Sequence, residues 1–345
     1  MKRAMRYILF AAIGWGLPAH AAPIEKARFT VSGEQPLECE GCRDEWIHAL
    51  RDIFSDIRSR KLTTGHIVRV ELGTPELLMA VTDRDPDGEC ADFEDATRYD
   101  PVKTVQPLPV RLRTVEEWVE SEDMDIAFSG SNFKFQDQGG VRAERPCGEM
   151  IGVNLRNGHL YWPPADRPEL LNENIDFNPD WPSHALLFNA DRTTDIVLVT
   201  DFDQLNEAAF GIGGSALFTI ENGDNPTPGS KPGSAIARLG VGILEDRKTI
   251  LIVKLEGNNN KVRDKANVPG HRMSRLRNLL RALGAIEAVN LDGSGSAHIV
   301  VRDPETGTSS RPADTEGARP IANHFGFRLT NDDVTWTSYG ARKED

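Results

Sequence analysis

Hydrophobic residues recur along this chain with two different periods. Two stretches have a spacing of three or four positions, which predicts an amphipathic helix over 44–59 and a second helix that starts near Pro269. Gly284 is expected to end the second helix, because glycine readily takes the left-handed conformation at a helix C-terminus. The residues that define these stripes are Trp46, Ile47, Leu50, Ile53, Phe54 and Ile57, followed by Met273, Leu276, Leu279, Leu280 and Leu283.

Elsewhere hydrophobic and polar residues alternate, which is typical of β-strands. Asn157-Gly158, between two of these segments, is the sequence signature of a tight hairpin. Residues 22–43 show neither period and are expected to be irregular. Strands are predicted over 66–72, 77–81, 108–112, 125–128, 152–155, 159–162, 185–189, 195–199, 216–220, 235–244 and 249–256.

The excess of strands over helices sets the predicted fold class. Short turns favour antiparallel or mixed sheets, and the helix before Gly284 would pack on them. We therefore expect an α+β fold, with mixed or antiparallel sheets, one long helix packed on them and a single main domain. The expected divisions are a signal peptide at 1–21, an N-terminal extension with the first helix and strands at 22–120, a core at 121–332 and a C-terminal tail at 333–345.

The N-terminus has the three parts of a secretory signal peptide. Lys2, Arg3 and Arg6 precede an apolar run over 7–17, and the small-residue site Ala19-His20-Ala21 follows. The apolar run is too short to cross a bilayer as a helix, and no later segment reaches the required length. We therefore expect an exported protein, periplasmic or secreted, without a membrane span after the signal peptide is removed.

The charge of the chain argues against one class of partner. The formal net charge is −13, and removal of residues 1–21, which carry three positive and no negative charges, changes it to −16. Because no basic stripe offsets this charge, nucleic acid is not an expected partner.

Cysteine usage agrees with an oxidising compartment. Cys39, Cys42, Cys90 and Cys147 can form two disulfides. Cys39 and Cys42 have the spacing of a redox or metal motif, but no second cysteine pair or suitably spaced histidines accompany them. We therefore expect structural disulfides, no metal site and no cofactor.

The segment 288–296 runs from an apolar strand into a turn with an unusual density of polar groups. Asp292 is flanked by Asn290, two serines and two glycines. Gly293 and Gly295 can take positive φ, so that successive N–H groups would point into one concavity suited to a phosphate or an oxyanion. An ordinary hairpin turn is the alternative interpretation. The sequence thus predicts an active-site turn.

From about 125 to 329, the order of motifs resembles the phosphodiester glycosidase family, which includes the lysosomal enzyme that uncovers mannose 6-phosphate. The family hallmark Asn-Leu-Asp-Gly-Gly-Gly-Ser is matched by 290–296, with Ser294 in place of the middle glycine. Departures occur at Ser129, where the family has Asn, and after Leu255, where Glu256 replaces Asp and the family Arg is missing. The further matching segments are 129–133, 211–217, 238–242, 255–258 and 319–323.

The resemblance implies hydrolysis of a sugar-1-phosphodiester at the anomeric C–O bond, which releases the sugar and leaves a phosphomonoester on an exported glycan or glycoconjugate. Carboxylates serve such reactions as nucleophile, base or charge stabiliser, which suits Asp292 and Glu256. Guanidinium groups bind phosphate oxygens in pairs, which suits Arg238 and Arg319. The other expected substrate-binding residues are Asn290, Gly293, Ser294, Gly295, Ser296, Asn323, Ser129, Gly130, Gly213 and Gly214.

Several alternatives remain open from the sequence. The departures from the family motifs allow a non-catalytic binding protein for phosphorylated glycans, or a phosphodiesterase that cleaves the P–O bond. Asp201 and Asp203 follow a strand as in aspartyl-phosphate phosphatases, but the residues after them do not fit that motif. His298 and His324 lie near the matched motifs, and either can reach the site or serve a structural role.

Overall fold

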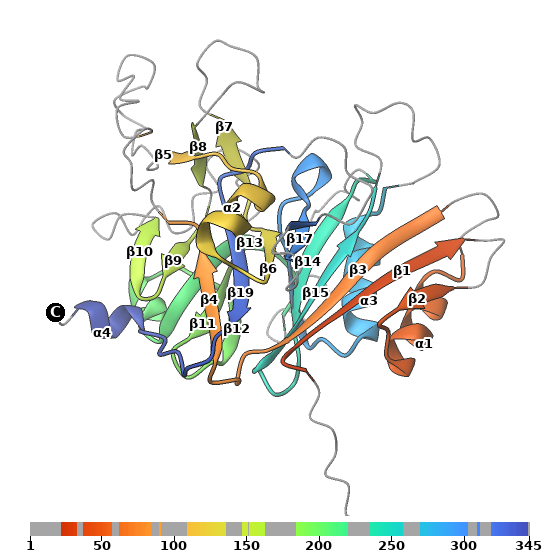
Figure 1. The fold of residues 1–345 in the computed structure, drawn as a ribbon, viewed down its shortest axis with the longest axis horizontal. Helices are drawn as coiled ribbons and strands as arrows, with labels where there is room; N and C mark the ends of the chain where they lie inside the picture. The colour runs from red at the N-terminus through yellow and green to blue at the C-terminus, as the bar shows by residue number, and fades with distance from the viewer. Residues whose placement is uncertain are drawn as a thin grey trace, which may run out of the picture.

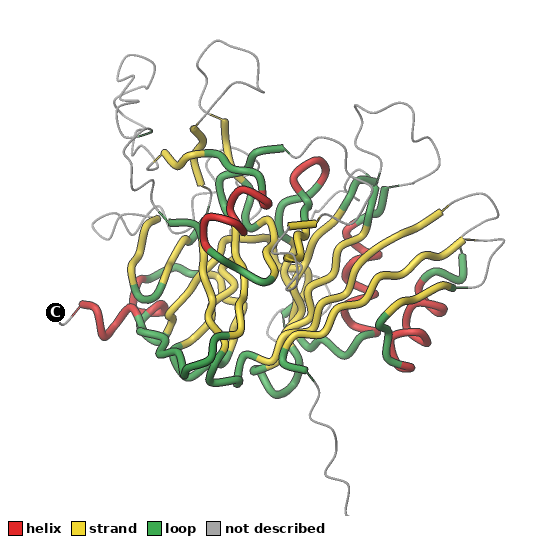
Figure 2. The backbone as a smooth tube through the Cα atoms, viewed as in Figure 1, coloured by secondary structure: helices red, strands yellow, loops and turns green. Residues whose placement is uncertain are grey.

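The computed structural model describes residues 22–32, 37–56, 62–83, 90, 109–135, 147–150, 152–162, 184–219, 235–257, 270–302, 309–310 and 319–343. The expected signal peptide, 1–21, lies outside these residues. Strands predominate in the described part of the chain, as the yellow segments of Figure 2 show. All of its strand pairs between named strands are antiparallel.

The largest described sheet has eleven strands and extends across the molecule (Figure 1). Its main path is β10-β9-β13-β16-β14-β15-β3-β1-β2, and β11 joins β12 to β13. The strands are β1 (Ile24–Ser32), β2 (Glu38–Glu40), β3 (Leu62–Glu71), β9 (Asn154–Arg156), β10 (His159–Trp162), β11 (His184–Asn189), β12 (Thr194–Leu198), β13 (Ala208–Phe218), β14 (Arg238–Ile243), β15 (Thr249–Leu255) and β16 (Glu287–Asn290).

Two smaller sheets complete the described β-structure. The five-stranded sheet has the order β18-β17-β6-β19-β4, and the three-stranded sheet has the order β5-β8-β7. Their strands are β4 (Leu77–Val81), β5 (Pro109–Arg111), β6 (Ile126–Ser129), β7 (Phe133–Phe135), β8 (Cys147–Met150), β17 (Ile299–Arg302), β18 (Ser309–Ser310) and β19 (His324–Leu329).

The main hydrophobic core lies between the eleven-stranded and the five-stranded sheets. Val241 of β14 and Ile252 of β15 belong to the same buried cluster as Phe128 of β6 and Phe325 of β19. The opposite face of the large sheet is covered by α1 (Asp44–Ile53) and α3 (Met273–Ala282). Both faces of β14 and β15 are therefore buried, which explains why all their residues are apolar or shielded from solvent.

The predicted α+β class with one long helix was wrong, because the fold is mostly antiparallel sheet with several short helices. α1 and α3 have 10 residues each, and α2 (Val115–Glu122) has 8. The remaining helical segments are α4 (Tyr339–Lys343) and the 3₁₀ turns η3 (Phe202–Leu205) and η4 (Ser294–Ser296). The second predicted helix begins at Met273 rather than near Pro269, because His271 is extended and pairs with Ile236. Gly284 follows it with φ 96°, as expected.

Local predictions had mixed outcomes. The hairpin at Asn157-Gly158 is confirmed, with φ of 45° and 80° at the two residues and β9 paired with β10. The prediction that residues 22–43 are irregular was wrong, because β1 occupies part of this segment and pairs with β3 along nine residues. β3 and β4 come from the expected N-terminal extension, yet they pair with β15 and β19.

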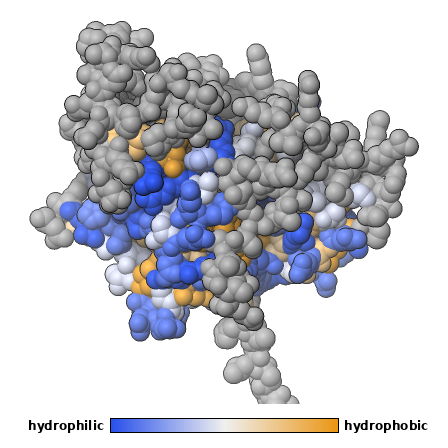
Figure 3. All heavy atoms as spheres, turned by 45° about the horizontal axis from the view of Figure 1, so that its top comes forward, coloured by the Kyte–Doolittle hydropathy of each residue, from blue (hydrophilic) through white to orange (hydrophobic). Residues whose placement is uncertain are grey.

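Both expected disulfides form, and they join Cys39 to Cys42 and Cys90 to Cys147. Hydrophilic residues prevail on the described part of the face seen in Figure 3. Leu198 and Leu329 are the large hydrophobic side chains that are exposed among the described residues. None of the described helices has the length and apolar character required to cross a bilayer.

Candidate active site

Three neighbouring strands of the large sheet bring both predicted carboxylates and one arginine together at one end of these strands. β15 ends at Leu255, which pairs with Arg238 at the start of β14, and β16 ends at Asn290, which pairs with the third residue of β14. Because β14 is antiparallel to both neighbours, its start lies beside their ends. Asp292 and Glu256 therefore lie about two strand spacings apart, roughly 10 Å at the backbone.

The polar turn after β16 is hydrogen-bonded to both sheets. The Asp292 N–H donates to the carbonyl of Gly130, which follows β6, at 3.0 Å. The Ser294 N–H donates to the carbonyl of Ala237, which precedes β14, at 3.0 Å. The turn is therefore fixed where the edges of the two sheets meet.

The backbone of this turn differs from the expected one at its glycines. Positive φ falls on Ser294, at 57°, whereas Gly293 is extended with φ −123° and Gly295 is not among the positive-φ residues. A side chain at Gly293 would be crowded, since a Cβ there would lie 3.1 Å from the Ala237 carbonyl oxygen. The predicted nest with both glycines at positive φ is thus replaced by a single strained serine.

Asp292 is partly buried and holds its carboxylate against its own turn. Its Oδ1 accepts a hydrogen bond of 2.7 Å from the Gly293 N–H. Burial raises the pKa of Asp292 to about 6, while the Gly293 N–H, the Ser296 hydroxyl and the charge of Arg319 act in the opposite direction. A carboxyl group with this pKa can exchange a proton near neutral pH.

Both predicted arginines lie beside the turn. Arg238 is 6% exposed, its Nε donates to the His271 carbonyl at 3.0 Å, and its Nη1 lies 3.7 Å from the position of a Cβ on Gly293. Arg319 approaches from the segment before β19, where its guanidinium carbon lies 5.3 Å from the Phe133 ring centroid. Its charge lowers the pKa of Asp292. Arg319 thus acts on the Asp292 carboxylate, and Arg238 lies beside the next residue of the turn.

Glu256 belongs to a buried charge cluster. Its Oε1 lies 2.6 Å from the Nζ of Lys254, and the lysine side chain is only 1% exposed. The Nε2 of His66, from β3, lies 3.9 Å from the same oxygen. Burial, together with the charge of Lys254, lowers the pKa of His66 to about 3, so this imidazole is neutral at physiological pH. Glu256 is therefore ion-paired to Lys254 alone in this cluster.

Two buried asparagines add polar atoms next to the turn. Asn323 is 0% exposed and its Nδ2 donates to the Ser131 hydroxyl at 2.9 Å, while the Asn290 Nδ2 donates to the Leu291 carbonyl at 2.7 Å. The Oδ1 atoms of Asn323 and Asn290 are buried and have no hydrogen-bond partner among the described residues. Such acceptors are suited to the hydroxyl groups of a sugar.

The remaining predicted binding residues have closer ties to the backbone. The Ser129 hydroxyl accepts a hydrogen bond of 3.0 Å from the His298 N–H, and the Gly130 N–H donates to the Asn323 carbonyl at 2.8 Å. A Cβ on Gly130 would lie 2.7 Å from the Asn323 Oδ1, so this glycine leaves room for the amide.

Gly213 and Gly214 lie inside β13 rather than in a loop. Ser215, the next residue, pairs with Asn290, so the two glycines are one strand away from the turn. A Cβ on Gly214 would lie 2.6 Å from a methyl carbon of Val289. These glycines therefore allow close packing of β13 on β16.

Lys254 was not assigned to the site from the sequence, and two roles were left open for His298. Lys254 is the partner of Glu256, and its signal was a lysine within the otherwise apolar strand β15. The His298 Nε2 donates to the Gly295 carbonyl, in the turn itself, at 2.8 Å, and burial lowers the His298 pKa to about 4. His298 thus supports the turn as a neutral imidazole. No cluster of metal-ligating side chains occurs within the described ranges.

Several solved structures are similar to this chain. The catalytic domain of zebrafish N-acetylglucosamine-1-phosphodiester alpha-N-acetylglucosaminidase, auto-inhibited by its pro-peptide, is 15% identical, with a TM-score of 0.54 over 90% of this chain and 85% of that chain. A putative exported protein from Burkholderia pseudomallei is 12% identical, with a TM-score of 0.45 over 79% and 75% of the two chains. A hypothetical protein from Synechocystis is 10% identical, with a TM-score of 0.45 over 78% and 60%.

Sequence comparison agrees with the motifs. The search of curated proteins found no match. The family model for phosphodiester glycosidases matches residues 126–328, which include the turn, both arginines and Glu256. This match spans more than half of the chain and confirms the resemblance drawn from the motifs. The chain therefore belongs to the phosphodiester glycosidase family.

Proposed function

We propose that the protein hydrolyses a sugar-1-phosphodiester at the bond between the anomeric carbon and the phosphate oxygen. Family membership supports a glycosidase that acts on phosphodiesters. The observation that carries the proposal is the gathering of Asp292, Arg238 and Arg319 at one turn. A carboxylate suits the reacting carbon, and two guanidinium groups suit the phosphate that leaves it.

Asp292 is proposed as the general base. It takes a proton from a water molecule while the water oxygen bonds to the anomeric carbon, and its pKa near neutrality is suited to this transfer. The C–O bond breaks, and its electron pair stays on the phosphate oxygen. Arg238 and Arg319 offset the charge that develops there. The products are the free sugar and a phosphomonoester, and Asp292 returns its proton to solvent.

Glu256 is proposed as the second carboxylate, and its Oε1 is ion-paired to the Lys254 Nζ at 2.6 Å. An anion beside the reacting carbon would stabilise the positive charge of an oxocarbenium-like transition state. Lys254 is then a positioning residue, because it acts on the reaction through Glu256. The buried Oδ1 atoms of Asn290 and Asn323 would accept hydrogen bonds from the sugar.

The proposed setting is outside the cytoplasm, in the periplasm or beyond it. The two disulfides suit an oxidising compartment. The basic and apolar pattern of residues 1–21 supports export. The proposed substrate is accordingly a phosphodiester on an exported glycan or glycoconjugate.

Hydrolysis in ¹⁸O-labelled water tests the bond that is cleaved. A chromogenic sugar-1-phosphate diester is incubated with the full-length mature protein, and both products are analysed by mass spectrometry. We expect the label in the sugar, because water attacks the anomeric carbon. Label in the phosphate would instead indicate cleavage of the P–O bond by a phosphodiesterase.

Paired variants test the role of the turn. Asp292→Asn should abolish turnover, whereas Asp52→Asn, which changes an exposed carboxylate on α1, should not alter it. Binding of the diester by wild-type protein without any product would favour the non-catalytic binding protein. An active Asp292→Asn variant would remove Asp292 from the mechanism.

A further inference from the structure

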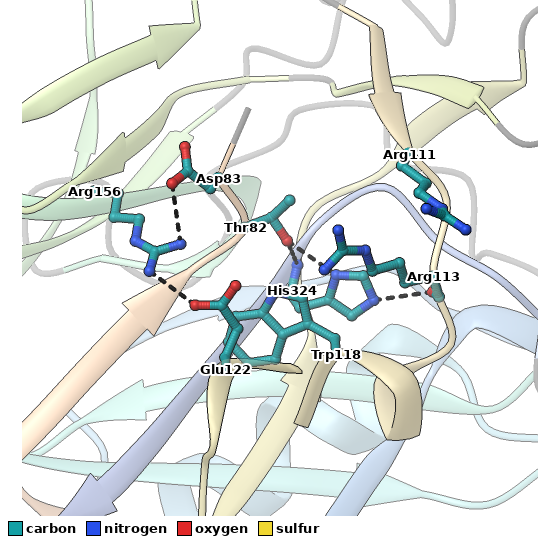
Figure 4. A pocket seen from close by; sticks show the side chains of 8 residues that line it. All are labelled: Thr82, Asp83, Arg111, Arg113, Trp118, Glu122, Arg156 and His324. Atoms are coloured by element: carbon teal, nitrogen blue, oxygen red, sulfur yellow. Dashed lines mark hydrogen bonds and ion pairs between the residues drawn. The ribbon is translucent and has the colours of Figure 1, made fainter. Parts of the chain in front are cut away.

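A second group of arginines lines a pocket beside the start of β19 (Figure 4). We call it the arginine pocket. Its floor is formed by Thr82, Trp118 and His324, and its walls carry Arg111, Arg113 and Arg156. No residue of this pocket belongs to the candidate active site described above.

The floor of the arginine pocket is uncharged and fixed by hydrogen bonds. The His324 Nε2 donates to the Arg113 carbonyl at 3.0 Å, and its Nδ1 accepts from the Thr82 hydroxyl at 2.9 Å. The imidazole stacks on Trp118, with ring centroids 5.4 Å apart. Burial lowers the pKa of His324 to about 3, so the floor carries no charge at physiological pH.

Arginines outnumber carboxylates among the described residues that line the pocket. Arg156 pairs with both carboxylates of the pocket, at 2.8 Å from Glu122 and 3.5 Å from Asp83. Arg111 and Arg113 line the other wall, where Arg113 donates to the neutral hydroxyl of Ser121 at 3.1 Å. The lining that the structure describes thus holds three arginines and two carboxylates, in a chain whose net charge is −13.

One chain segment, 319–324, links the arginine pocket to the candidate active site. The backbone of Arg113 pairs with Ile321, with hydrogen bonds of 3.1 and 2.8 Å. Ile321 comes two residues after Arg319, and His324 directly follows Asn323. The segment 319–324 therefore contributes residues to both places, since Arg319 and Asn323 lie in the active-site region and His324 lies in the arginine pocket.

We propose that the arginine pocket binds a second phosphodiester group of the substrate, separate from the group cleaved at Asp292. The proposal rests on the proposed function. Guanidinium groups bind phosphate oxygens with paired, charge-assisted hydrogen bonds, and Arg111 and Arg113 project from one wall (Figure 4). The substrate class is then a glycan whose sugars are joined by several phosphodiesters, which would bind at both places along one molecule.

Two substrates test this proposal. One is a chromogenic diester with a single phosphate, and the other is a synthetic oligomer of sugars joined by several phosphodiesters. For the wild-type protein we expect a higher kcat/KM per bond on the oligomer. Arg113→Gln and Arg111→Gln should each reduce this advantage about tenfold through KM, as for loss of one charge-assisted hydrogen bond. Arg51→Gln, an exposed change on α1, should preserve it.

The outcomes separate this proposal from the proposed function. Two results would overturn the proposal that the arginine pocket binds a second phosphodiester group. One is an equal kcat/KM on both substrates for the wild-type protein. The other is an undiminished preference for the oligomer in the double variant Arg111→Gln with Arg113→Gln. If neither substrate is cleaved, the proposed function fails. Calorimetric measurement of oligomer binding then still tests whether the arginine pocket binds a phosphodiester group. Equal affinities of the wild-type protein and the combined variant would then reject it, and about tenfold weaker binding by the variant would support it. Melting temperatures show whether each variant is folded.

Discussion

The two carboxylates of the candidate site have different surroundings. Burial opposes the charge of Asp292, whereas Glu256 faces the ammonium of Lys254 at 2.6 Å. Active sites use such differences to divide proton transfer from charge stabilisation between two acids. This contrast underlies the proposed assignment of Asp292 to proton transfer and Glu256 to charge stabilisation.

Asp292→Asn should raise the melting temperature at pH 8 although it abolishes turnover. Burial raises the folded-state pKa of Asp292 from the ordinary 3.8 to about 6, so the folded protein holds this proton more tightly than the unfolded chain. That contribution to stability is complete below about pH 4 and is lost as the pH rises through 6. The variant lacks this titration and should gain on the order of 1–3 kcal/mol at pH 8.

A series of melting curves from pH 4 to pH 8 checks this prediction. The difference in melting temperature between Asp292→Asn and the wild-type protein should shrink toward pH 4. The control Asp52→Asn should show no such trend. In the wild-type protein, kcat should also fall below about pH 6, because a general base must be deprotonated. A difference in melting temperature that stays constant with pH would contradict the assigned titration.

Lys254→Met should lower the free energy of unfolding by about 3–5 kcal/mol, because it leaves a buried carboxylate without its partner. The double variant Lys254→Met with Glu256→Gln should recover much of this loss, since both charges are then gone. Urea denaturation of the single and double variants measures the coupling. Lys248→Met, an exposed change in the same hairpin, is the control. Strictly additive losses would show that the two charges do not interact.

Asp292 and the two arginines could be found from the sequence because each lies in a short polar motif next to a strand. Lys254 gave a weaker signal, as one lysine within an apolar strand. Its contact with His66 depends on the pairing of β15 with β3, which joins residues almost 190 positions apart. Contacts of this kind are set by sheet register, which the sequence pattern does not specify.

Short elements with tertiary contacts account for most errors in the predicted secondary structure. The hydrophobic stripe predicted a helix over 44–59, but α1 already ends at Ile53. Phe54 leaves the helix and packs on Phe29, with the two ring centroids 5.8 Å apart. β1 was missed although Ala27, Phe29 and Val31 alternate with more exposed residues. Its polar residues weakened the pattern, and pairing with β3 and β2 stabilises the strand.

The backbone conformation of Ser294 in the η4 turn indicates a substitution that should stabilise the fold. Ser294 holds φ at 57°, a conformation that costs a residue with a side chain roughly 1 kcal/mol or more. Ser294→Gly should therefore raise the free energy of unfolding by about 1 kcal/mol, as measured by urea denaturation. Ser274→Gly, the same change at an exposed position of α3, should lower it by roughly 0.5–1 kcal/mol. Equal effects at both positions would contradict the role of φ.

The two disulfides should contribute different amounts to the free energy of unfolding of the whole molecule. Cys90 and Cys147 are 57 positions apart, whereas Cys39 and Cys42 are 3 apart. Loop-closure entropy then predicts a loss of about 4 kcal/mol when the first is removed and about 2 kcal/mol for the second. Calorimetric melting of the paired Cys→Ser variants measures both. A larger loss from the Cys39–Cys42 pair would contradict this ranking.

At the scale of the molecule, the sequence predicted the family and the active-site turn but not the arrangement of sheets. The motifs are local, so they could be read directly. The arginine pocket combines residues from β4, α2, β5, β9 and β19, and the relative places of these elements follow from packing between layers. Sequence patterns therefore indicated the candidate active-site residues but not the arginine pocket.

Attachment of the turn to both Gly130 and Ala237 makes catalysis sensitive to the alignment of the two layers. A small slip between them would move Asp292, the proposed base, away from Arg319 while each ladder of strands stayed whole. Gradual warming should then silence the enzyme several degrees before far-ultraviolet circular dichroism changes. Simultaneous loss of both signals would show that the layers separate only as the chain unfolds.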